Sequence, residues 1–525
     1  MTKDTFLTIL HGYHLDGSGS CIYVQSVVRE CARRGRKTLL LCQEPDIEKY
    51  DFVSEAYRCG PDGALTRLFR RDTGYDGEVI HVRPYLAEGL LPVFVDGPFP
   101  GFDNVKAFSS LSDAELTSYI ETNTAALLTA AARWPTETIF ANHIVMTPVI
   151  ARRACRQKKG LRYFLIPHGS EIEYLIKKDK RYLDLAIDVL DHAAGIVSGS
   201  EEMNERIAGL FPGAGRLTDG IRTISVGVDA EHFGAPLKKS PAGRLEDLLR
   251  EAALQAGTDD GPVNAVDEGF VESLDRLDPE KDTLLLNFGK MIPGKGVQDL
   301  LVVAPLLLAE NPRLKIVLAG DGPHRGFFSD LVALMQKGDG KAFFSAIEED
   351  NRACGEAFDD PYRFLSGFFD KRSSEDYFRL TSSFDWAERI LFAGYLRHAA
   401  LRHLLCLSSV AVFPSIVKEA YPLALLEAMA TGVFPIASDF GGLKDGLIQL
   451  DGLFPREISE MMRIPMERES RLEQMKEKIA GALAFHDGPV REAMVRRIGE
   501  RCSWKTVCTT LLEFFDGQSA SCEGG

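Results

Sequence analysis

Long apolar runs are missing from this chain of 525 residues. The longest, Leu300 to Ala309, is roughly half the length of a membrane-spanning helix and is interrupted by Pro305. No apolar signal-peptide core follows the first residues, which lead directly into a strand-like run. We therefore expect neither a membrane-spanning segment nor export, and we predict a cytoplasmic protein.

Paired cysteine motifs and excess positive charge are missing as well. The ten cysteines include no Cys-x-x-Cys pair, so we interpret them as reduced thiols and expect no disulfide framework or zinc site. The net charge of −15 argues against nucleic acid as a partner. There is no solenoid-length repeat and no low-complexity tract. What remains is the composition of a soluble globular protein, long enough for at least two domains.

The chain does contain a regular alternation of apolar runs and helical patterns, which predicts parallel α/β units. One helix is predicted to begin at the capping box of Ser112 and Glu115 and to end near Arg133. Strands are expected in the first half at 6–13, 38–42, 79–82, 138–141, 163–167, 195–198 and 223–228. In the second half they are expected at about 284–288, 315–319, 390–393, 410–413 and 434–437.

The most informative stretch is Lys418–Gly432, which follows the buried-strand pattern of 410–416. Glu419 lies in the loop at the carboxyl end of that strand, and Glu427 lies two helical turns further on. Ligands bind at this end of open parallel sheets, and the amino end of a helix suits a phosphate. Two carboxylates there suit the hydroxyls of a sugar and a ribose. The alternative is a surface helix with two ordinary glutamates.

Its neighbours make this stretch more specific. The segment "FPSIVKEAYPLALLEAMATGVFPIASDFGGLKD" resembles the Glu-x7-Glu signature of family 4 retaining glycosyltransferases, which have the GT-B fold. Upstream, "LLLNFGKMIPGKGVQDLL" resembles that family's strand and basic phosphate loop, and "LKIVLAGDGP" resembles its next strand and turn. The resemblance covers about residues 284–325 and 389–445. It is thinner over the first 230 residues and absent from two long inserts.

The resemblance implies an α/β protein of the GT-B class, with two Rossmann-like parallel-sheet domains facing each other across a cleft. The N-terminal acceptor domain would span 1–233, and the nucleotide-sugar domain would span 283–502. An acidic linker or insert, 234–282, would join them. A helical insert of about 327–389 would shape the acceptor site, form a subunit contact, or lie far from the cleft. A helix of about 503–525 would pack back on the first domain.

The resemblance also assigns roles to single residues. His168, Lys295 and Glu419 are expected at the chemistry: the histidine beside the transferred sugar, the lysine at the leaving diphosphate and the glutamate on sugar hydroxyls. Donor-binding residues would be Gly19, Lys290, Lys295, Glu419, Ala420, Tyr421, Pro422, Leu423 and Glu427. The family typically has arginine in the place of Lys290, and lysine cannot make the bidentate fork.

Each of these candidates has a structural alternative. A histidine that closes a strand, as His168 does, is commonly a satisfied structural residue, and the two lysines could be solvated. Further histidines, His143 at another strand end and His11 and His14 beside the first loop, are second candidates for the donor or acceptor site.

The implied reaction moves a hexose, with retention, from a nucleotide-diphosphate sugar to a small-molecule, glycan or lipid-linked acceptor. UDP-sugar is the expected donor, and no cofactor is expected. No Asp-x-Asp pair is placed at a strand end, so no metal site is expected and the lysines would replace Mg²⁺ as counter-charge. The alternatives are an epimerase or a phosphorylase of the same fold, and a non-catalytic nucleotide-sugar-binding protein. Basic clusters at 33–37 and 152–162 could contact a membrane, but the acidic whole favours ordinary solvated helices.

Overall fold

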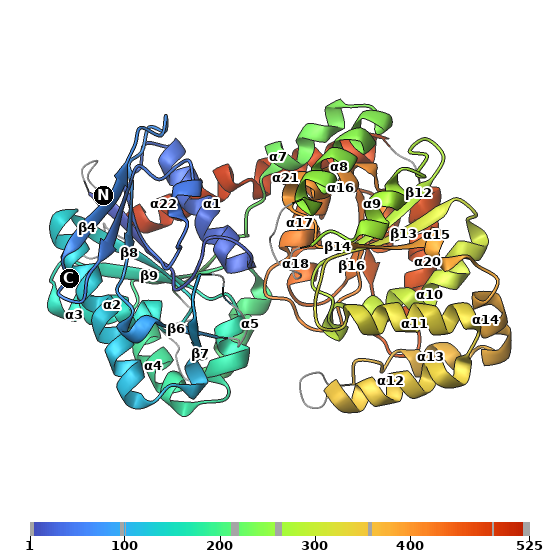
Figure 1. The fold of residues 1–525 in the computed structure, drawn as a ribbon, viewed down its shortest axis with the longest axis horizontal. Helices are drawn as coiled ribbons and strands as arrows, with labels where there is room; N and C mark the ends of the chain where they lie inside the picture. The colour runs from blue at the N-terminus through green and yellow to red at the C-terminus, as the bar shows by residue number, and fades with distance from the viewer. Residues whose placement is uncertain are drawn as a thin grey trace. The chain divides into compact units, whose positions relative to one another are not determined.

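The chain forms two compact units (Figure 1). The computed structural model describes residues 5–94, 99, 101–211, 220–257, 265–354, 360–485 and 488–517. The first unit contains Met1–Gly227 and Trp504–Gly525, and the second contains Val228–Ser503. Residues 258–264 of the predicted acidic segment, 355–359 of the predicted insert and 518–525 of the predicted last helix lie outside the described residues.

The first unit is built on a nine-stranded sheet in which only the β3–β4 pair is antiparallel. Its strands, in spatial order, are β11 (Ile221–Thr223), β10 (Gly195–Ser198), β9 (Arg162–Ile166), β8 (Thr136–Asn142), β1 (Phe6–Leu10), β2 (Thr38–Leu41), β5 (Val79–Arg83), β3 (Glu55–Cys59) and β4 (Leu65–Arg70). A separate parallel pair is formed by β6 (Leu90–Val93) and β7 (Asn104–Ala107). The chain order reverses between β1 and β8, which is where such sheets bind ligands.

Helices cover both faces of this sheet (Figure 1). They are α1 (Gly19–Arg33), α2 (Asp113–Arg133), α3 (Thr147–Gln157), α4 (Lys180–Asp191), α5 (Glu201–Leu210) and α22 (Trp504–Gly517), with short turns η1 (Ile47–Lys49), η2 (Ala87–Gly89), η3 (Phe108–Ser110) and η4 (Ile172–Ile176). The predicted capping box is confirmed: the Ser112 side chain accepts from the Glu115 amide, and the glutamate reaches back to the Ser112 amide.

Two strand predictions need correction in this unit. The strand expected at 223–228 is Ile221–Thr223, so it ends where it was expected to begin. The hairpin of β3 and β4 was not predicted, because β4 is an edge strand that is exposed along most of its length and lacks an apolar core face.

The last helix returns to the first unit after the whole second unit. Trp504 packs edge-on against Tyr23 of α1, at 5.4 Å between ring centroids. A Cβ on Gly195 would lie 2.7 Å from the Phe514 ring, so the strand can approach α22 only without a side chain. The Arg162 guanidinium donates to the Phe515 carbonyl at 3.0 Å. Burial of these aromatic rings holds α22 on the unit in which the chain began.

The second unit has a six-stranded parallel sheet in the order β14 (Ile390–Gly394), β13 (Leu314–Ala319), β12 (Thr283–Phe288), β15 (Val410–Phe413), β16 (Phe434–Ser438) and β17 (Arg463–Ile464). Counted along the chain this is 3-2-1-4-5-6, the dinucleotide-binding order. β12, β13 and β15 are almost wholly buried, as strands covered by helices on both faces must be. The order reverses between β12 and β15.

The helices of this unit, with its short turns, are α7 (Ala230–Gly234), η5 (Ala235–Lys238), α8 (Pro241–Ala256), α9 (Glu268–Leu274), η7 (Pro293–Lys295), α10 (Val297–Glu310), α11 (Arg325–Lys337), α12 (Gly340–Cys354), α13 (Leu365–Phe369), α14 (Ser374–Thr381), α15 (Trp386–Arg389), α16 (His398–Leu407), α17 (Leu423–Ala430), α18 (Gly441–Ile448), α19 (Arg456–Met461), α20 (Arg471–Ala484) and α21 (Gly488–Cys502). The acidic segment contributes α8, which packs on α16. The insert contributes α11 to α15. No helix of the described residues is both long and apolar enough to cross a membrane.

Candidate functional site

Two loops meet at the point where the order of the second sheet reverses. The loop after β12 carries Lys290 and Lys295, and the loop after β15 carries Glu419. Gly296 has φ +72°, and a Cβ there would overlap the carbonyl of Pro414, so the two loops approach as closely as backbone allows. The Ile416 amide donates to the Gly294 carbonyl at 2.9 Å.

This contact brings Lys295 and Glu419 together. Lys295 Nζ lies 2.8 Å from Glu419 Oε2, and the side chains are 32% and 16% exposed. A half-buried lysine on a glycine-rich loop can meet an anion, and the carboxylate beside it can accept from hydroxyl groups. The pair therefore offers one positive and one negative group to the same ligand.

Lys290 lies apart from this pair. Its side chain is exposed, and it forms no ion pair with any carboxylate among the described residues. It comes directly after Gly289, which has φ +142° and lies in the turn that follows β12. The two predicted phosphate lysines therefore differ: one is already paired and one is in solvent.

The amino end of α17 carries the predicted backbone ligands. Pro422 is the N-cap residue of this helix, which begins at Leu423. Proline has no side-chain acceptor, so no side chain caps the helix at this residue. The first amides of α17 are therefore available to an anion. The Gly442 amide donates to the Glu419 carbonyl at 2.8 Å, which ties this loop to the start of α18.

Glu427 lies on the first turns of α17 and is 8% exposed. Its Oε1 is 3.3 Å from Nε2 of His398, the first residue of α16, which follows β14. His398 was not among the predicted site residues. The available signal was its position at the carboxyl end of a strand, in the sequence "FAGYLRH".

A buried ion pair lies beneath both loops. Arg471 Nε donates to Asp299 Oδ2 at 3.0 Å, and neither side chain is exposed to solvent. The same guanidinium donates to the Pro414 carbonyl at 2.6 Å and to Ser438 Oγ at 3.1 Å. Burial raises the pKa of Asp299 to about 6 in spite of its cationic neighbour. The arginine thus joins α10, α20 and the ends of β15 and β16 at one point, and no sequence motif marked it.

In the first unit, His168 follows β9 as predicted and contacts the end of β8. Its Nε2 lies 3.0 Å from Asn142 Oδ1. The Asn142 amide nitrogen donates to the Leu10 carbonyl at 2.9 Å, which turns its oxygen toward the histidine. Nε2 of His168 therefore carries the proton, and Nδ1 is an acceptor.

His143 and Glu171 complete this cluster. His143 Nδ1 lies 3.2 Å from Glu171 Oε2, and the other carboxylate oxygen accepts from the His168 amide at 2.9 Å. Burial, together with the charge of His143, lowers the pKa of His168 well below its usual value. Burial opposes ionisation of Glu171, but His143 and the hydrogen bonds outweigh it, and the pKa of Glu171 is lowered to about 2. At neutral pH the candidate histidine is therefore a neutral hydrogen-bonding group.

Gly19 is the first residue of α1 and is exposed. Ser18 caps the helix by accepting from the Cys21 amide at 3.4 Å, and Gly17 has φ +92°. The loop follows β1, whose neighbour in the sheet is β8. β8 ends at Asn142, and His143 is the next residue. Gly19 and the histidine cluster therefore lie at neighbouring strand ends of the first sheet. The second candidate His11 is buried there too, with its pKa lowered by burial to about 3.

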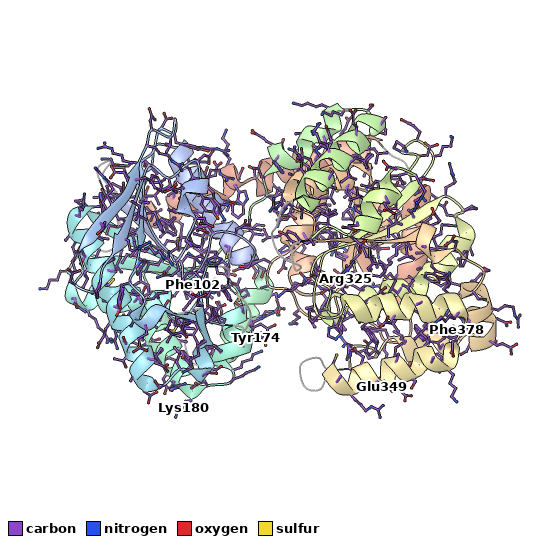
Figure 2. All side chains as sticks on the ribbon, viewed as in Figure 1. Phe102, Tyr174, Lys180, Arg325, Glu349 and Phe378 are labelled. Atoms are coloured by element: carbon purple, nitrogen blue, oxygen red, sulfur yellow. The ribbon has the colours of Figure 1, made fainter. Side chains whose placement is uncertain are left out.

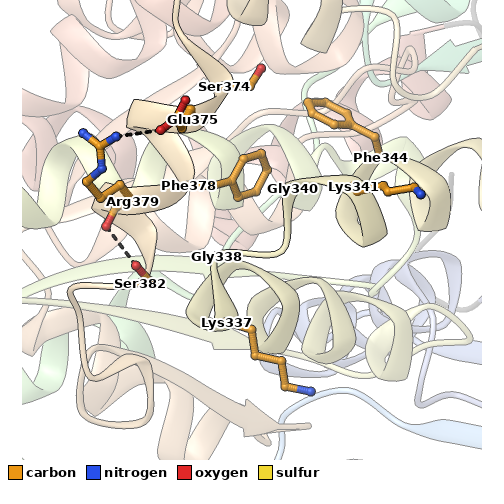
Figure 3. Close-up of a pocket in the computed structure, with 10 residues that line it drawn as sticks. All are labelled: Lys337, Gly338, Gly340, Lys341, Phe344, Ser374, Glu375, Phe378, Arg379 and Ser382. Atoms are coloured by element: carbon orange, nitrogen blue, oxygen red, sulfur yellow. Dashed lines mark hydrogen bonds and ion pairs between the residues drawn. The ribbon is translucent and has the colours of Figure 1, made fainter.

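A separate hollow of about 440 Å³ lies on the helical insert (Figure 3). Its lining residues are Lys337, Gly338, Gly340, Lys341, Phe344, Ser374, Glu375, Phe378, Arg379 and Ser382. Arg379 is held by Glu375 at 3.0 Å, as Figure 3 shows. None of the predicted site residues lines this hollow.

Comparison with known proteins supports the same part of the chain. Residues 363–454 match the family described as "Glycosyl transferases group 1". A segment of 161 residues is 26% identical to the "Uncharacterized glycosyltransferase YqgM" of Bacillus subtilis (strain 168). The match covers 31% of this chain and 31% of that protein, so it spans about a third of the curated relative.

Solved structures resemble the chain along almost its whole length. Sucrose-phosphate synthase (tll1590) from Thermosynechococcus elongatus covers 98% of this chain and 100% of its own, with a TM-score of 0.56 and 15% identity. Anabaena Alr3699/HepE in complex with UDP covers 98% and 100%, with a TM-score of 0.54 and 12% identity. The fold is GT-B. This agrees with the fold class predicted from the sequence.

The buried pair beneath the loops yields a stability prediction. Arg471→Met leaves the Asp299 carboxylate buried without its partner, and breaking a buried pair in this way typically costs about 3–5 kcal/mol. The pKa of Asp299 in the folded protein is already raised above its usual value, so the folded state binds this proton more tightly than the unfolded state does. The free energy of unfolding of the variant should therefore fall as the pH rises from about 5 to 8. Urea denaturation across that range measures it.

The matched control is Arg471→Met combined with Asp299→Asn, which removes the unpaired charge and should recover part of the loss. A single variant with wild-type stability, or with a loss that does not depend on pH, would contradict the assignment of this pair.

Proposed function

We propose that the protein is a retaining glycosyltransferase that moves a hexose from a nucleotide-diphosphate sugar to an acceptor. The observation that carries the proposal is the convergence of Lys295, Glu419 and the uncapped amino end of α17 at the reversal point of a 3-2-1-4-5-6 sheet. This is where such sheets bind nucleotides. The glycosyltransferase family match over 363–454 includes Glu419, Glu427 and α17.

In this proposal, each part of the donor binds the residue whose charge suits it. Lys295 and the first amides of α17 face the diphosphate, Glu419 accepts from hydroxyls of the sugar, and Glu427 accepts from the ribose. The Lys295–Glu419 contact refines these roles. An incoming diphosphate competes with Glu419 for the lysine, so donor binding redirects both side chains. UDP is the proposed nucleotide, because a structure of similar fold was solved with UDP.

The chemical step needs charge stabilisation on the leaving diphosphate. The α17 amides supply it from fixed positions, and Lys295 supplies it once the diphosphate has replaced Glu419 as its partner, which lowers the barrier without a metal ion. His168 is neutral, so its role is to hydrogen-bond a sugar hydroxyl, not to supply positive charge. The acceptor attacks on the face from which the diphosphate departs, and a diphosphate oxygen takes its proton.

One experiment separates this reaction from its alternatives. The protein is incubated with UDP-sugars, and the products are resolved by NMR with and without added acceptors. A glycosidic product with the donor's anomeric configuration supports the proposal. An altered sugar nucleotide formed without acceptor identifies an epimerase, phosphate-dependent release identifies a phosphorylase, and binding without any product identifies a sugar-nucleotide-binding protein.

The first prediction for the donor site concerns Glu427. Glu427→Gln should weaken binding of both UDP and the UDP-sugar by roughly 1.5–3 kcal/mol, because a charge-assisted hydrogen bond to the ribose is lost. Calorimetry measures both affinities. Glu457→Gln, on α19, is the matched control and should bind as the wild type does. Unchanged UDP affinity in a folded Glu427→Gln protein would rule out the ribose role.

The second prediction separates Lys295 from Glu419. Lys295→Met should lower turnover at saturating donor by about 10²–10³, with a smaller effect on donor affinity, because the charge on the leaving group develops in the transition state. Glu419→Gln should lose transfer and sugar selectivity while UDP affinity does not fall, because the diphosphate no longer competes with a carboxylate for Lys295. Lys444→Met, exposed on α18, is the control for the loss of a lysine. Near wild-type turnover of Lys295→Met would sink this assignment.

The third prediction is that turnover needs no added Mg²⁺ or Mn²⁺. The positive groups at the leaving diphosphate come from the chain itself, so activity should survive EDTA in the assay. Activity that disappears in EDTA and returns with Mg²⁺ or Mn²⁺ would show that the account of the leaving group is wrong.

A further inference from the structure

A cluster of unlike ligand atoms lies where the helical insert meets the phosphate loop. His324 immediately precedes α11, and Asp350 and Cys354 lie one helical turn apart on α12. Their ligand atoms all lie within 4.8 Å of one another. Figure 2 labels Arg325, at the start of α11, and Glu349, beside Asp350 on α12.

The spacing within this cluster has the size of a metal coordination shell. His324 Nε2 is 3.4 Å from Asp350 Oδ1, Cys354 Sγ is 3.5 Å from Asp350 Oδ2, and Cys354 Sγ is 3.7 Å from His324 Nε2. Ligand atoms at the bond lengths and tetrahedral angles of zinc are separated by about 3.3–3.7 Å. The histidine contacts Oδ1 of Asp350 and the cysteine contacts Oδ2, so the carboxylate lies between the two other ligands and can offer either oxygen to an ion.

The surroundings also suit a cation. Asp350 is 13% exposed and His324 is 21% exposed, so the ligand atoms are shielded but can be reached. Tyr362 donates its hydroxyl hydrogen to Asp350 Oδ2 at 2.5 Å, and this hydrogen bond fixes the orientation of the carboxylate. Supporting hydrogen bonds of this kind are a regular feature of metal sites. Glu348 and Glu349 precede Asp350 and add negative charge to this stretch of α12.

We propose that His324, Asp350 and Cys354 bind one Zn²⁺ ion. A nitrogen, an oxygen and a sulfur ligand together suit zinc better than the hard cations, which take oxygen ligands. The Cys354 thiol loses its proton to solvent when the ion binds, and the ion keeps a fourth position for water. Searching for Cys-x-x-Cys spacing could not find this site, because the three ligands come from two elements.

The ion has a structural role in this proposal. The His324 amide donates to the Met291 carbonyl at 3.1 Å, and the Met291 amide donates to the Asp321 carbonyl at 3.0 Å. Met291 lies in the loop between Lys290 and Lys295. An ion that joins His324 to α12 would therefore connect the insert to this loop through the hydrogen bond between His324 and Met291. The ligands of this ion are not among the proposed donor-binding residues, so the ion takes no part in stabilising the leaving diphosphate.

Metal content tests the proposal without any donor sugar. The full-length protein is stripped with a chelator, dialysed against Zn²⁺ and freed of excess metal, and its zinc is counted by mass spectrometry. The wild type should retain about one ion per chain. Cys354→Ser and His324→Gln should retain less, with affinity for Zn²⁺ lowered at least tenfold in chelator competition. Cys155→Ser, a cysteine of α3 in the first unit, is the matched control and should retain as much as the wild type.

A second measurement covers variants that fold poorly. Co²⁺ added to the stripped wild type should give a thiolate-to-cobalt charge-transfer band, which Cys155→Ser keeps and Cys354→Ser loses. The wild type should also unfold at a higher temperature with Zn²⁺ than without it. The proposal is overturned if the stripped wild type binds no zinc, or if Cys354→Ser retains as much as Cys155→Ser. These outcomes are independent of transferase activity, so either proposal can fail alone.

Discussion

The site of the second unit depends on one crowded contact between two backbone loops. The loop after β12 and the loop after β15 can meet only because Gly296 leaves room for the Pro414 carbonyl. The Arg471 guanidinium, buried with Asp299, donates to that same carbonyl from beneath. Isolated buried pairs often add little to stability, because desolvation offsets the attraction. Here the pair also fixes the position of the Pro414 carbonyl, and the candidate side chains Lys295 and Glu419 lie on the two loops that meet there.

The proposed placement of Lys295 and Glu419 at the donor depends on that contact between the two loops. Lys295 and Glu419 come from loops that are far apart in sequence, and they meet because β12 and β15 are neighbours in the sheet. The amino end of α17 points into the same region because the helix starts directly after the second loop. A phosphate binding there would meet the backbone amides of α17 and Lys295, and the lysine would have to separate from Glu419. In the proposed function, donor binding therefore has to break the Lys295–Glu419 ion pair.

In the first unit, the candidate histidine is also held in place by residues from neighbouring strand ends, here through hydrogen bonds. Asn142, at the end of β8, sets the tautomer of His168, and Glu171 joins the His168 amide to His143. Burial beside aromatic rings lowers the pKa of His168, so this imidazole stays neutral. The Glu171 carboxylate stays charged because His143 and its hydrogen bonds lower its pKa in spite of burial. Such a group can orient a hydroxyl, but it offers little to a developing positive charge.

The sequence by itself determined the features that depend on residues close together in the chain. Apolar runs between helical patterns predicted the parallel sheets, and the capping box predicted the start of α2. The GT-B fold was expected from the resemblance of the segments around Glu419 and Glu427 to a known family. Those features depend on neighbours in the chain, so they can be recognised in one dimension. The edge strand β4 was missed because it is exposed along most of its length and lacks an apolar face.

Only the tertiary structure decided which side chains meet. The contacts of Lys295 with Glu419, of His398 with Glu427, and of Arg471 with Asp299 each join elements distant in sequence. The cluster of His324, Asp350 and Cys354 likewise joins residues from two elements. Burial, charge pairing and ligand geometry depend on distances in space, and strand order sets those distances. No motif spacing encodes them.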